Sequence, residues 1–262
     1  MNLRRLTLVL LILFGLANLY AIFARGILAA FLVPLIGLTF AVLHAGQREG
    51  WKGALVLLGL VFVVSLFFES LGVATGWVYG PYHYTARLGP KFLGLVPFII
   101  PVAWFMMSYP SFIIAEWLVP GAPGQNGSGA GRRILAVAAV GGLVMTAWDV
   151  VMDPIMVAGG HWVWDVQGPY YGIPLQNFWG WWLTVFSTYG LYLLVRGRVA
   201  QPRWADPAFD RMAMLAYLAT TVSTVCGALL AGSGDLGLIG FFSMVPWVLV
   251  GLLRLSDRTA QA

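Results

Sequence analysis

The sequence predicts an all-α fold, a polytopic transmembrane bundle of about eight helices with both termini in the cytoplasm. Of its 262 residues, 60% are hydrophobic and only 10% are charged, whereas soluble domains carry about 25% charged residues. The mean hydropathy is +0.84. Eight apolar stretches each have about the 20 residues that a helix needs to cross a bilayer. A soluble globular fold is therefore excluded.

The apolar stretches give the expected membrane helices in chain order: residues 6–23, 27–44, 54–73, 98–119, 134–155, 178–195, 212–231 and 236–253. The first stretch follows Arg4 and Arg5, as the apolar part of a signal peptide would. It is longer than that part usually is, and it lacks a good A-x-A cleavage site. We therefore expect the chain to retain it as a helix.

Basic residues divide unevenly between the two sides of this bundle. Eight crossings place both termini on one side, and all of the 15 Lys and Arg residues lie on that side except Arg25, Arg87 and Lys91. The positive-inside rule then puts both termini in the cytoplasm of a multi-pass plasma-membrane protein. The same asymmetry explains the net charge of +5, so nucleic acid is not an expected partner.

The whole chain, residues 1–262, is expected to form a single integral membrane domain. A Gly- and Pro-rich segment, residues 119–133, predicts a flexible cytoplasmic linker between the fourth and fifth helices. A G-x-G-x-x-G pattern at residues 232–237 joins two membrane helices and follows no expected strand. It therefore does not predict a nucleotide site.

Cysteine and histidine are scarce in this chain. The single Cys226 excludes an intrachain disulfide and a thiolate metal cluster. His44, His83 and His161 are too few and too scattered to hold the two irons of a membrane hydroxylase. We therefore expect no bound metal.

Two long loops on the outer side, residues 74–97 and 156–177, are dense in Trp, Tyr, Gly and Pro. They also resemble each other, because WVYGPY at residues 77–82 has a counterpart in WVW followed by GPY at residues 162–170. This similarity favours an internal duplication of a helix-loop-helix unit, as in some transporters. The alternative is an aromatic belt, in which Trp and Tyr only anchor the bundle at the membrane interface.

Three acidic residues lie in the membrane helices close to these loops. Glu69 is near the outer end of the third helix, and Asp149 and Asp153 are one turn apart near the outer end of the fifth. Acidic residues inside a membrane are costly and usually functional, which indicates a site inside the bundle. The alternative is that they only bind loop amides and indole N–H groups. Glu116, at the cytoplasmic end of its helix, is expected to snorkel to the interface.

Two segments resemble a known family: FFESLGVATGWVYGPYHYTARLGPKFLGLVPFIIPVAWFMMSYP at residues 67–110 and AWDVVMDPIMVAGGHWVWDVQGPYYGIPLQNFWGWW at residues 147–182. Over roughly its middle half, the chain is similar to the carotenoid biosynthesis membrane-protein family. Characterised members are carotenoid 1',2'-hydratases of the gamma-carotene and bisanhydrobacterioruberin hydratase type. The resemblance implies addition of water across the terminal C=C of an acyclic (psi) carotenoid end, which gives a tertiary alcohol without a redox cofactor.

Hydration of such an alkene needs an acid, a surface that stabilises a tertiary carbocation, and one bound water molecule. A carboxyl group in an apolar setting has a raised pKa and can serve as the acid, and two carboxyls one turn apart can share a proton. Asp149 and Asp153 fit this arrangement as the catalytic pair. Glu69 is expected to orient the water or to share the proton network. His83 and Asn177 are expected as polar helpers.

Aromatic faces stabilise cations through their quadrupole, and Trp does so most strongly. The expected substrate-binding residues are therefore the aromatic side chains of the outer loops and the adjoining helix ends: Trp77, Tyr79, Tyr82, Tyr84, Trp148, Trp162, Trp164, Tyr170, Tyr171 and Trp181. The expected partners are a carotenoid that enters from within the bilayer, membrane lipid, and other enzymes of the carotenoid pathway.

The sequence does not exclude two other functions. Asp149-x-x-x-Asp153 is superficially similar to an aspartate motif of prenyl-transferring membrane enzymes. Such an enzyme needs a second acidic motif and a basic diphosphate clamp, for which only Arg87 and Lys91 are plausible. Carotenoid or lipid binding or transport is favoured by the possible repeat and by a fourth helix that its prolines are expected to break.

Overall fold

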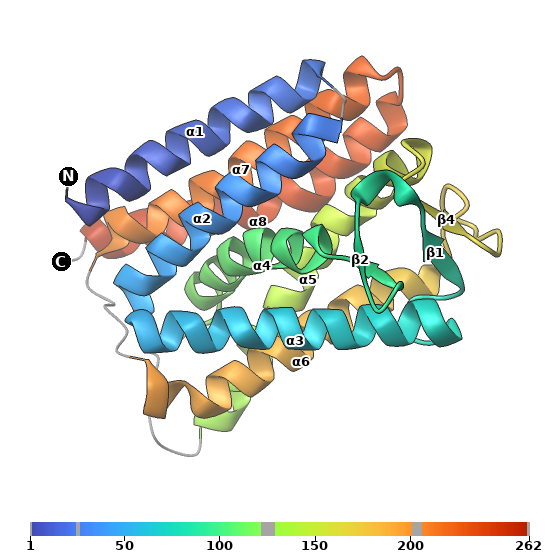
Figure 1. The fold of residues 1–262 in the computed structure, drawn as a ribbon. Coiled ribbons are helices and arrows are strands. Elements are labelled where there is room, and N and C mark those ends of the chain that lie inside the picture. The colour runs from blue at the N-terminus through green and yellow to red at the C-terminus, as the bar shows by residue number, and fades with distance from the viewer. Residues whose placement is uncertain (1, 25–26, 122–128, 201–205, 261–262) are drawn as a thin grey trace.

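A computed structural model describes residues 2–24, 27–121, 129–200 and 206–260. These residues form eight α-helices, shown in Figure 1: α1 (Leu3–Phe23), α2 (Ile27–Glu49), α3 (Trp51–Thr75), α4 (Ile99–Leu118), α5 (Ala130–Ala158), α6 (Leu175–Val199), α7 (Pro207–Leu230) and α8 (Gly234–Ala260). The outer loops hold four short strands and one 3₁₀ turn: β1 (Tyr82–Tyr84), η1 (Ala86–Leu88), β2 (Lys91–Phe92), β3 (Val96–Pro97) and β4 (Trp162–Trp164). The predicted all-α bundle is confirmed.

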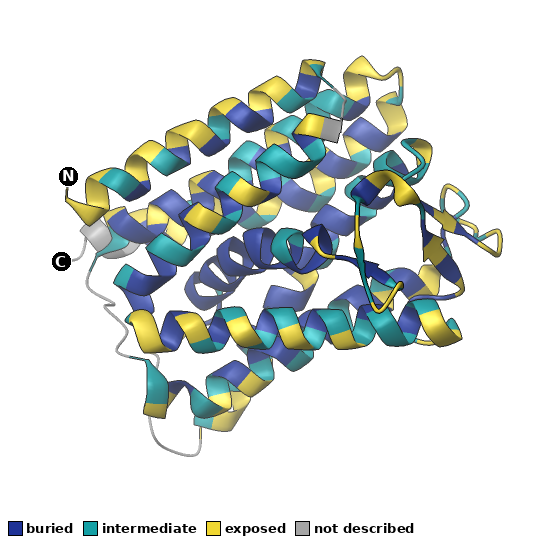
Figure 2. Cartoon of the chain, in the orientation of Figure 1, coloured by how far each residue is buried: buried dark blue, intermediate teal, exposed yellow. Residues whose placement is uncertain are grey.

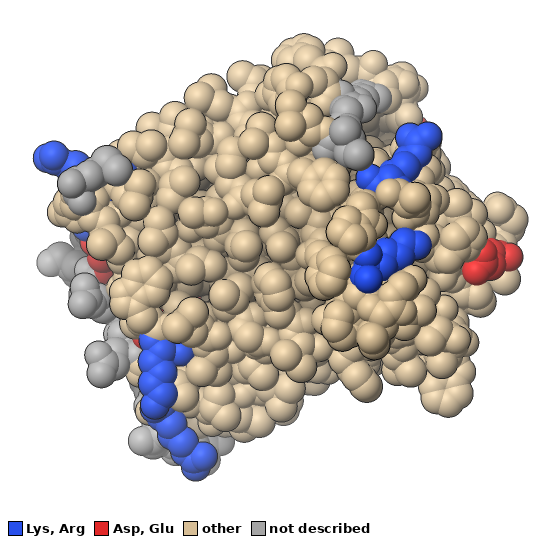
Figure 3. All heavy atoms as spheres, viewed as in Figure 1, with Lys and Arg blue, Asp and Glu red and all other residues tan. Residues whose placement is uncertain are grey.

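Seven of the eight described helices are long and apolar enough to cross a membrane, and α6 is the exception. α6 has 25 residues, as many as α3, but its Trp, Tyr and Arg residues lower its hydropathy. It packs against both α5 and α3, so it belongs to the same bundle. Figure 3 shows a broad uncharged band on the visible face, with charged residues gathered at its two ends. The chain is thus a multi-pass membrane protein.

Each expected membrane segment coincides with one helix, but most helices extend beyond the apolar run. α2 continues to Glu49, and α5 already begins at Ala130. Apolar runs identify the part of a helix that meets lipid or the core, whereas backbone hydrogen bonding continues into the polar ends. The expected linker 119–133 is therefore too long, because its last four residues are helical. Its central part, residues 122–128, lies outside the described residues.

α4 is the central helix of the bundle. Most of its side chains are buried, it contacts α2, α3, α5, α7 and α8, and Figure 2 shows it dark blue along most of its length. The expectation that prolines break this helix is wrong, because α4 continues through Pro110. Pro101 lies in the first turn, where the missing N–H has no helical partner in any case, and Pro97 precedes the helix in β3.

Both chain ends lie at the same end of the bundle in Figure 1. The loops between α3 and α4 and between α5 and α6 lie at the opposite end, which we call the outer end. This arrangement agrees with an even number of crossings. Which end faces the cytoplasm stays a prediction from the basic residues.

The two aromatic loops meet in a small antiparallel sheet at the outer end. β1 pairs with β4, with Tyr82 opposite Trp164 and Tyr84 opposite Trp162. Side chains alternate along a strand, so these four aromatic residues are buried while His83, between the two tyrosines, is exposed. The aromatic-belt alternative is therefore wrong for these four side chains. An internal duplication of the two loops stays a prediction.

Candidate active site

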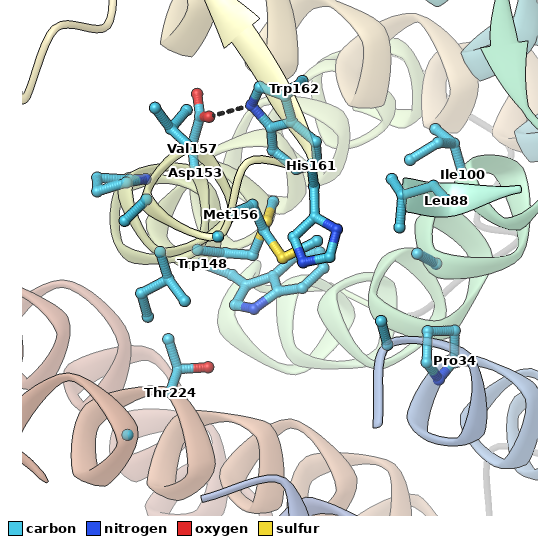
Figure 4. Close-up of a pocket in the computed structure, with 18 of the residues that line it drawn as sticks. Pro34, Leu88, Ile100, Trp148, Asp153, Met156, Val157, His161, Trp162 and Thr224 are labelled. Atoms are coloured by element: carbon cyan, nitrogen blue, oxygen red, sulfur yellow. Dashed lines mark hydrogen bonds between the residues drawn. The ribbon is translucent and has the colours of Figure 1, made fainter. Parts of the chain in front are cut away.

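A cavity of about 790 Å³ lies inside the outer half of the bundle, and Figure 4 shows part of it. All eight helices and both outer loops contribute to its wall. Carboxyl and aromatic groups come from α3 to α6 and from the loops, and amide groups come from Asn177 of α6 and Asn18 of α1. α1, α2 and α7 otherwise contribute mainly small side chains such as Ala29, Ala30 and Gly227. The volume is in the range of sites that hold small molecules.

Glu69 of α3 lies on the cavity wall and is held by three donors. Its carboxylate accepts hydrogen bonds from the hydroxyl of Tyr82, from the hydroxyl of Tyr84 at 2.8 Å and from the indole N–H of Trp104 at 3.0 Å. Burial, together with the charge of Glu69, raises the pKa of the Tyr82 and Tyr84 hydroxyls well above the usual value. Both tyrosines therefore remain donors, and they tie β1 to α3.

Asp149 and Asp153 of α5 are both buried and share one amide donor. Nδ2 of Asn177, on α6, donates to Oδ2 of each aspartate at 2.8 Å. Oδ1 of Asp153 accepts from Nε1 of Trp162 at 2.6 Å, drawn as a dashed line in Figure 4. Asp153 lines the cavity, whereas Asp149 does not, and Oδ1 of Asp149 has no hydrogen-bond partner within the described residues. Only Asp153 of this pair can therefore meet a molecule in the cavity.

Aromatic rings surround these carboxyl groups. Trp104 and Trp181 stack with ring centroids 4.2 Å apart, and Trp148 packs edge-on against Trp181 at 5.9 Å. Tyr82 packs against Trp164 at 5.0 Å. All five side chains line the cavity. A cation that formed beside Asp153 would therefore have aromatic neighbours on several sides.

Most of the residues expected from the sequence line this cavity: Glu69, Tyr79, Tyr82, Tyr84, Trp148, Asp153, Trp162, Trp164, Tyr171, Asn177 and Trp181. Three of the expected binding residues do not. Trp77 is 71% exposed, and His83 is exposed and pairs through Nδ1 with Asp165 at 2.8 Å. Their expected roles at the site are corrected, because the strand alternation turns His83 outward and Trp77 lies on the surface beyond α3.

Tyr170 is the third expected residue that does not line the cavity. Its hydroxyl donates to the backbone carbonyl of Val150 at 2.9 Å. That carbonyl lacks its usual helical partner because Pro154, four residues later, has no N–H. α5 nevertheless continues to Ala158. Tyr170 therefore secures the second outer loop to α5 beside the aspartate pair.

Among the cavity-lining residues that were not expected from the sequence, two carry aromatic ring nitrogens, Trp104 and His161. Trp104 lies in the middle of the apolar helix α4, where its sequence context does not distinguish it from other buried aromatic residues. His161 lies in the turn between α5 and β4. Its position after Gly159 and Gly160, directly before the WVW strand, was the signal that could have identified it. Within the described part of the chain, no His, Cys, Asp or Glu residues form a group of three or more that could hold a metal ion.

Glu116 is not an interface residue, and that expectation is wrong. Its carboxylate is buried and accepts hydrogen bonds from Arg133 at 3.0 Å and from Arg196 at 2.8 Å. It belongs to a network of charged residues from α2, α4, α5, α6 and α7: Arg48, Glu49, Glu116, Arg133, Arg196 and Asp210. These residues lie near the terminus end of the bundle and do not line the cavity.

The fold and the cavity define a multi-pass membrane protein with an internal site that combines carboxyl, amide and aromatic groups. The chain belongs to the carotenoid biosynthesis protein family, whose sequence model matches residues 9–240. It is similar to the bisanhydrobacterioruberin hydratase of Haloarcula japonica, with 36% identity over 152 residues. That match covers 58% of this chain and 46% of the relative, so the chain spans about half the length of the curated relative it matches. No solved structure matches the chain.

Proposed function

We propose that this protein is a carotenoid hydratase, which adds water to the terminal C=C of an acyclic (psi) carotenoid end and forms a tertiary alcohol. Membership of the carotenoid biosynthesis family and the name of the Haloarcula relative support the substrate class and the reaction. The observation that carries the proposal is the place of Asp153, a carboxyl group on the wall of a largely apolar cavity among aromatic rings. Hydration transfers no electrons to or from the carotenoid, so an acid, a cation-stabilising surface and water suffice.

In this proposal Asp153 donates its proton to the less substituted carbon of the alkene, which leaves the positive charge on the tertiary carbon. Two carboxyl groups that share a site do not both ionise readily, so the Asp149 and Asp153 pair retains a proton. The amide of Asn177 fixes the pair by donating to both side chains. A water molecule then attacks the tertiary carbon and loses one proton. Alkene and water thereby give one alcohol.

The carbocation needs stabilisation where little water is present. We assign this role to the indole rings of Trp104, Trp148 and Trp181 on the cavity wall. A cation over such a ring is stabilised by about 0.5–2 kcal/mol. Glu69 is a positioning residue in this account, because all three hydrogen bonds that it accepts come from side chains of the same wall.

The rest of the cavity suits a long polyene. Its wall on α1, α2 and α7 contains small side chains, among them Ala21, Ala29, Ala30, Gly227 and Ala228. Small residues on facing helices leave room for a slender chain between them. A carotenoid dissolves in the bilayer, so we propose that it enters laterally between helices and places its psi end near Asp153.

Two alternative functions fit these observations less well. A prenyl-transferring enzyme needs free basic side chains for a diphosphate, but Arg87 donates to the carbonyl of Gly159 and Lys91 donates to the carbonyl of Tyr84. Carotenoid or lipid binding without chemistry would fit the same cavity. Transport was favoured by the expectation of a broken fourth helix. Because α4 is continuous, this support for transport is lost.

Expression in a lycopene-accumulating bacterial host, with pigment analysis by mass, tests the proposal. We expect a new pigment heavier than lycopene by one water, present with the wild-type chain and absent with an empty vector. The same host expressing Asp153→Asn at equal membrane levels serves as the matched control. Wild-type chain that carries only unchanged lycopene would support binding or transport and contradict the hydratase proposal.

A further inference from the structure

One ionisable side chain on the cavity wall has no hydrogen-bond partner of its own. Glu69 accepts three hydrogen bonds and Asp153 accepts two, while the lining tyrosines donate to fixed partners. The imidazole of His161 lines the same cavity, yet neither ring nitrogen has a partner within the described residues, and its Nδ1 is buried. A buried polar atom of this kind is usually satisfied by water or a ligand.

The backbone holds His161 in place at the outer end of the cavity. Its N–H donates to the carbonyl of Met156 at 3.0 Å, and its carbonyl accepts from the N–H and hydroxyl of Thr85 at 3.0 and 3.1 Å. A Cβ added at Gly159 would lie 3.0 Å from Cδ2 of the imidazole, so glycine gives the ring its space. Figure 4 shows the ring beside Met156, at the edge of the open space. The two ring nitrogens without hydrogen-bond partners therefore belong to a residue whose backbone is held in place by hydrogen bonds.

Few charged or titratable groups surround this ring. Arg87 of η1 lies beside the turn and donates to the carbonyl of Gly159 at 3.1 Å. The other titratable groups on the cavity wall are the carboxyls of Asp153 in α5 and Glu69 in α3 and the hydroxyls of four tyrosines, and all of them already have partners. The four tyrosines are Tyr79, Tyr82, Tyr84 and Tyr171. Among the residues that the structure describes, no anion pairs with this ring to keep it protonated.

His161 is also accessible to water. It is only half-buried, and it lies in the loop between α5 and β4 at the outer end of the bundle. Burial and the positive charge of Arg87 lower the pKa of His161 below its usual value. The ring is therefore neutral near pH 7, and one of its nitrogens can accept a hydrogen bond.

We propose that His161 holds the attacking water of the hydration and accepts its proton as the C–O bond forms. This inference rests on the proposed hydratase function and adds to it the base that takes the proton from water. Glu69 and Asp153 are poorly suited to this task, because both already accept hydrogen bonds from side chains of the wall.

Atoms and charges balance in this step. Asp153 gives a proton to the alkene carbon, and the water oxygen forms a bond to the tertiary carbon. One O–H bond of that water breaks, and the proton goes to the free nitrogen of His161. The imidazolium then releases a proton to water at the outer side, and Asp153 takes up one proton from water. The net reaction is alkene plus water to tertiary alcohol, with no oxidant or reductant.

Three variants of His161 test the proposal in the full chain, purified and placed in liposomes that contain lycopene. His161→Phe keeps a ring but removes both nitrogens, and we expect it to lower turnover per folded molecule by about 100-fold or more. The matched control is His83→Phe, because His83 lies in the paired strand, points outward and pairs with Asp165. We expect His83→Phe to keep wild-type turnover.

The pH profile separates this role from a merely structural one. Protonated imidazole cannot accept the water proton, so the wild-type rate should fall as the pH drops through the pKa of His161. His161→Gln, which does not titrate, should lose this acid limb. His161→Gly should regain part of its turnover when imidazole is added, even if it yields less folded protein.

Equal turnover of wild type and His161→Phe would overturn the proposal. An acid limb that persists in His161→Gln, together with no rescue of His161→Gly by imidazole, would overturn it as well. A wild-type chain that forms no hydrated lycopene would instead contradict the hydratase function itself. The two failures are therefore distinguishable.

Discussion

Asp149 and Asp153 carry the same carboxyl group in two different surroundings. Asp153 faces the cavity and accepts an indole N–H from Trp162, whereas Asp149 lies behind it and is linked to it through Asn177. Their spacing along the helix makes the two residues equivalent in the sequence. Their surroundings favour Asp153 as the proton donor. Asp149 is its neighbour in the pair, and because two adjacent carboxyl groups do not both ionise readily, it helps the pair to retain a proton.

Asp153→Asn should therefore reduce hydration by about 100-fold or more, because an amide has nearly the same shape but no acidic proton. Asp149→Asn should reduce it less, since the donor remains. Both rates are measured as hydrated pigment per folded, membrane-inserted molecule. Near-normal turnover of Asp153→Asn would remove this residue from the mechanism and make Glu69 the candidate acid.

The residues of the site were only partly predictable from the sequence. Intramembrane carboxyl groups and aromatic loops are conspicuous in an apolar chain, so Glu69 and Asp153, which line the cavity, were predicted from composition and spacing. His83 was misplaced because strands of three residues give no clear period, and the pairing with β4 that turns it outward joins distant segments. Trp104 has no local signal, because its role depends on the carboxylate of Glu69 on another helix.

At the scale of the helices, the buried charge network near the terminus end links five helices through ion pairs. Arg48 of α2 donates to Asp210 of α7 at 2.7 Å, and Arg196 of α6 binds Glu49 of α2 at 2.6 Å. The burial of Glu116 was not predictable from the sequence, because a charge near a helix end is usually solvated and its arginine partners lie far away in the chain. Removal of one member leaves a buried charge uncompensated, which costs about 3–5 kcal/mol.

Asp210→Asn should therefore lower the free energy of unfolding by about 3–5 kcal/mol, because Arg48 loses one of its buried anionic partners and the network keeps a positive charge without a counter-charge. Thermal unfolding of the purified protein in detergent measures the effect. Arg4→Gln is the matched control, since the ion pair of Arg4 with Asp206 is exposed and should contribute little. An unchanged unfolding midpoint in Asp210→Asn would contradict a stabilising role for the network.

The helices themselves were predictable, and the reason is physical. A chain that crosses a bilayer must form the hydrogen bonds of its backbone N–H and C=O groups within each apolar run. The eight apolar runs therefore form eight helices. Helix ends and the continuity of α4 were not predictable from apolar runs. They depend on capping, on the position of each proline in its helix and on packing against neighbours.

At the scale of the whole molecule, the basic residues predict that the termini are cytoplasmic and that the cavity lies nearer the opposite side. In a Cys226→Ala background, Gly131→Cys should react only with reagents that reach the cytoplasm, and Val166→Cys should be labelled from outside. Both positions are exposed, and Gly131 has room for a side chain. The reverse pattern of labelling would overturn the predicted orientation.

The same orientation places the outer loops, and with them His161, toward the water of the outer side. The ion network then lies at the cytoplasmic end, away from the cavity. The molecule thus separates an outer half that holds the cavity from an inner half that holds the buried charge network. A substrate from the bilayer and water from the outer side can meet at Asp153 without crossing the network.

The source of the product oxygen tests the central claim, hydration of a carotenoid double bond, most directly. Cells that express the chain and accumulate lycopene are grown with isotopically labelled water or with labelled oxygen gas, and the hydroxylated pigment is analysed by mass. The account predicts that the label comes from water alone and that the product also forms without oxygen. Label from oxygen gas, or a strict need for oxygen, would contradict it and indicate a monooxygenase.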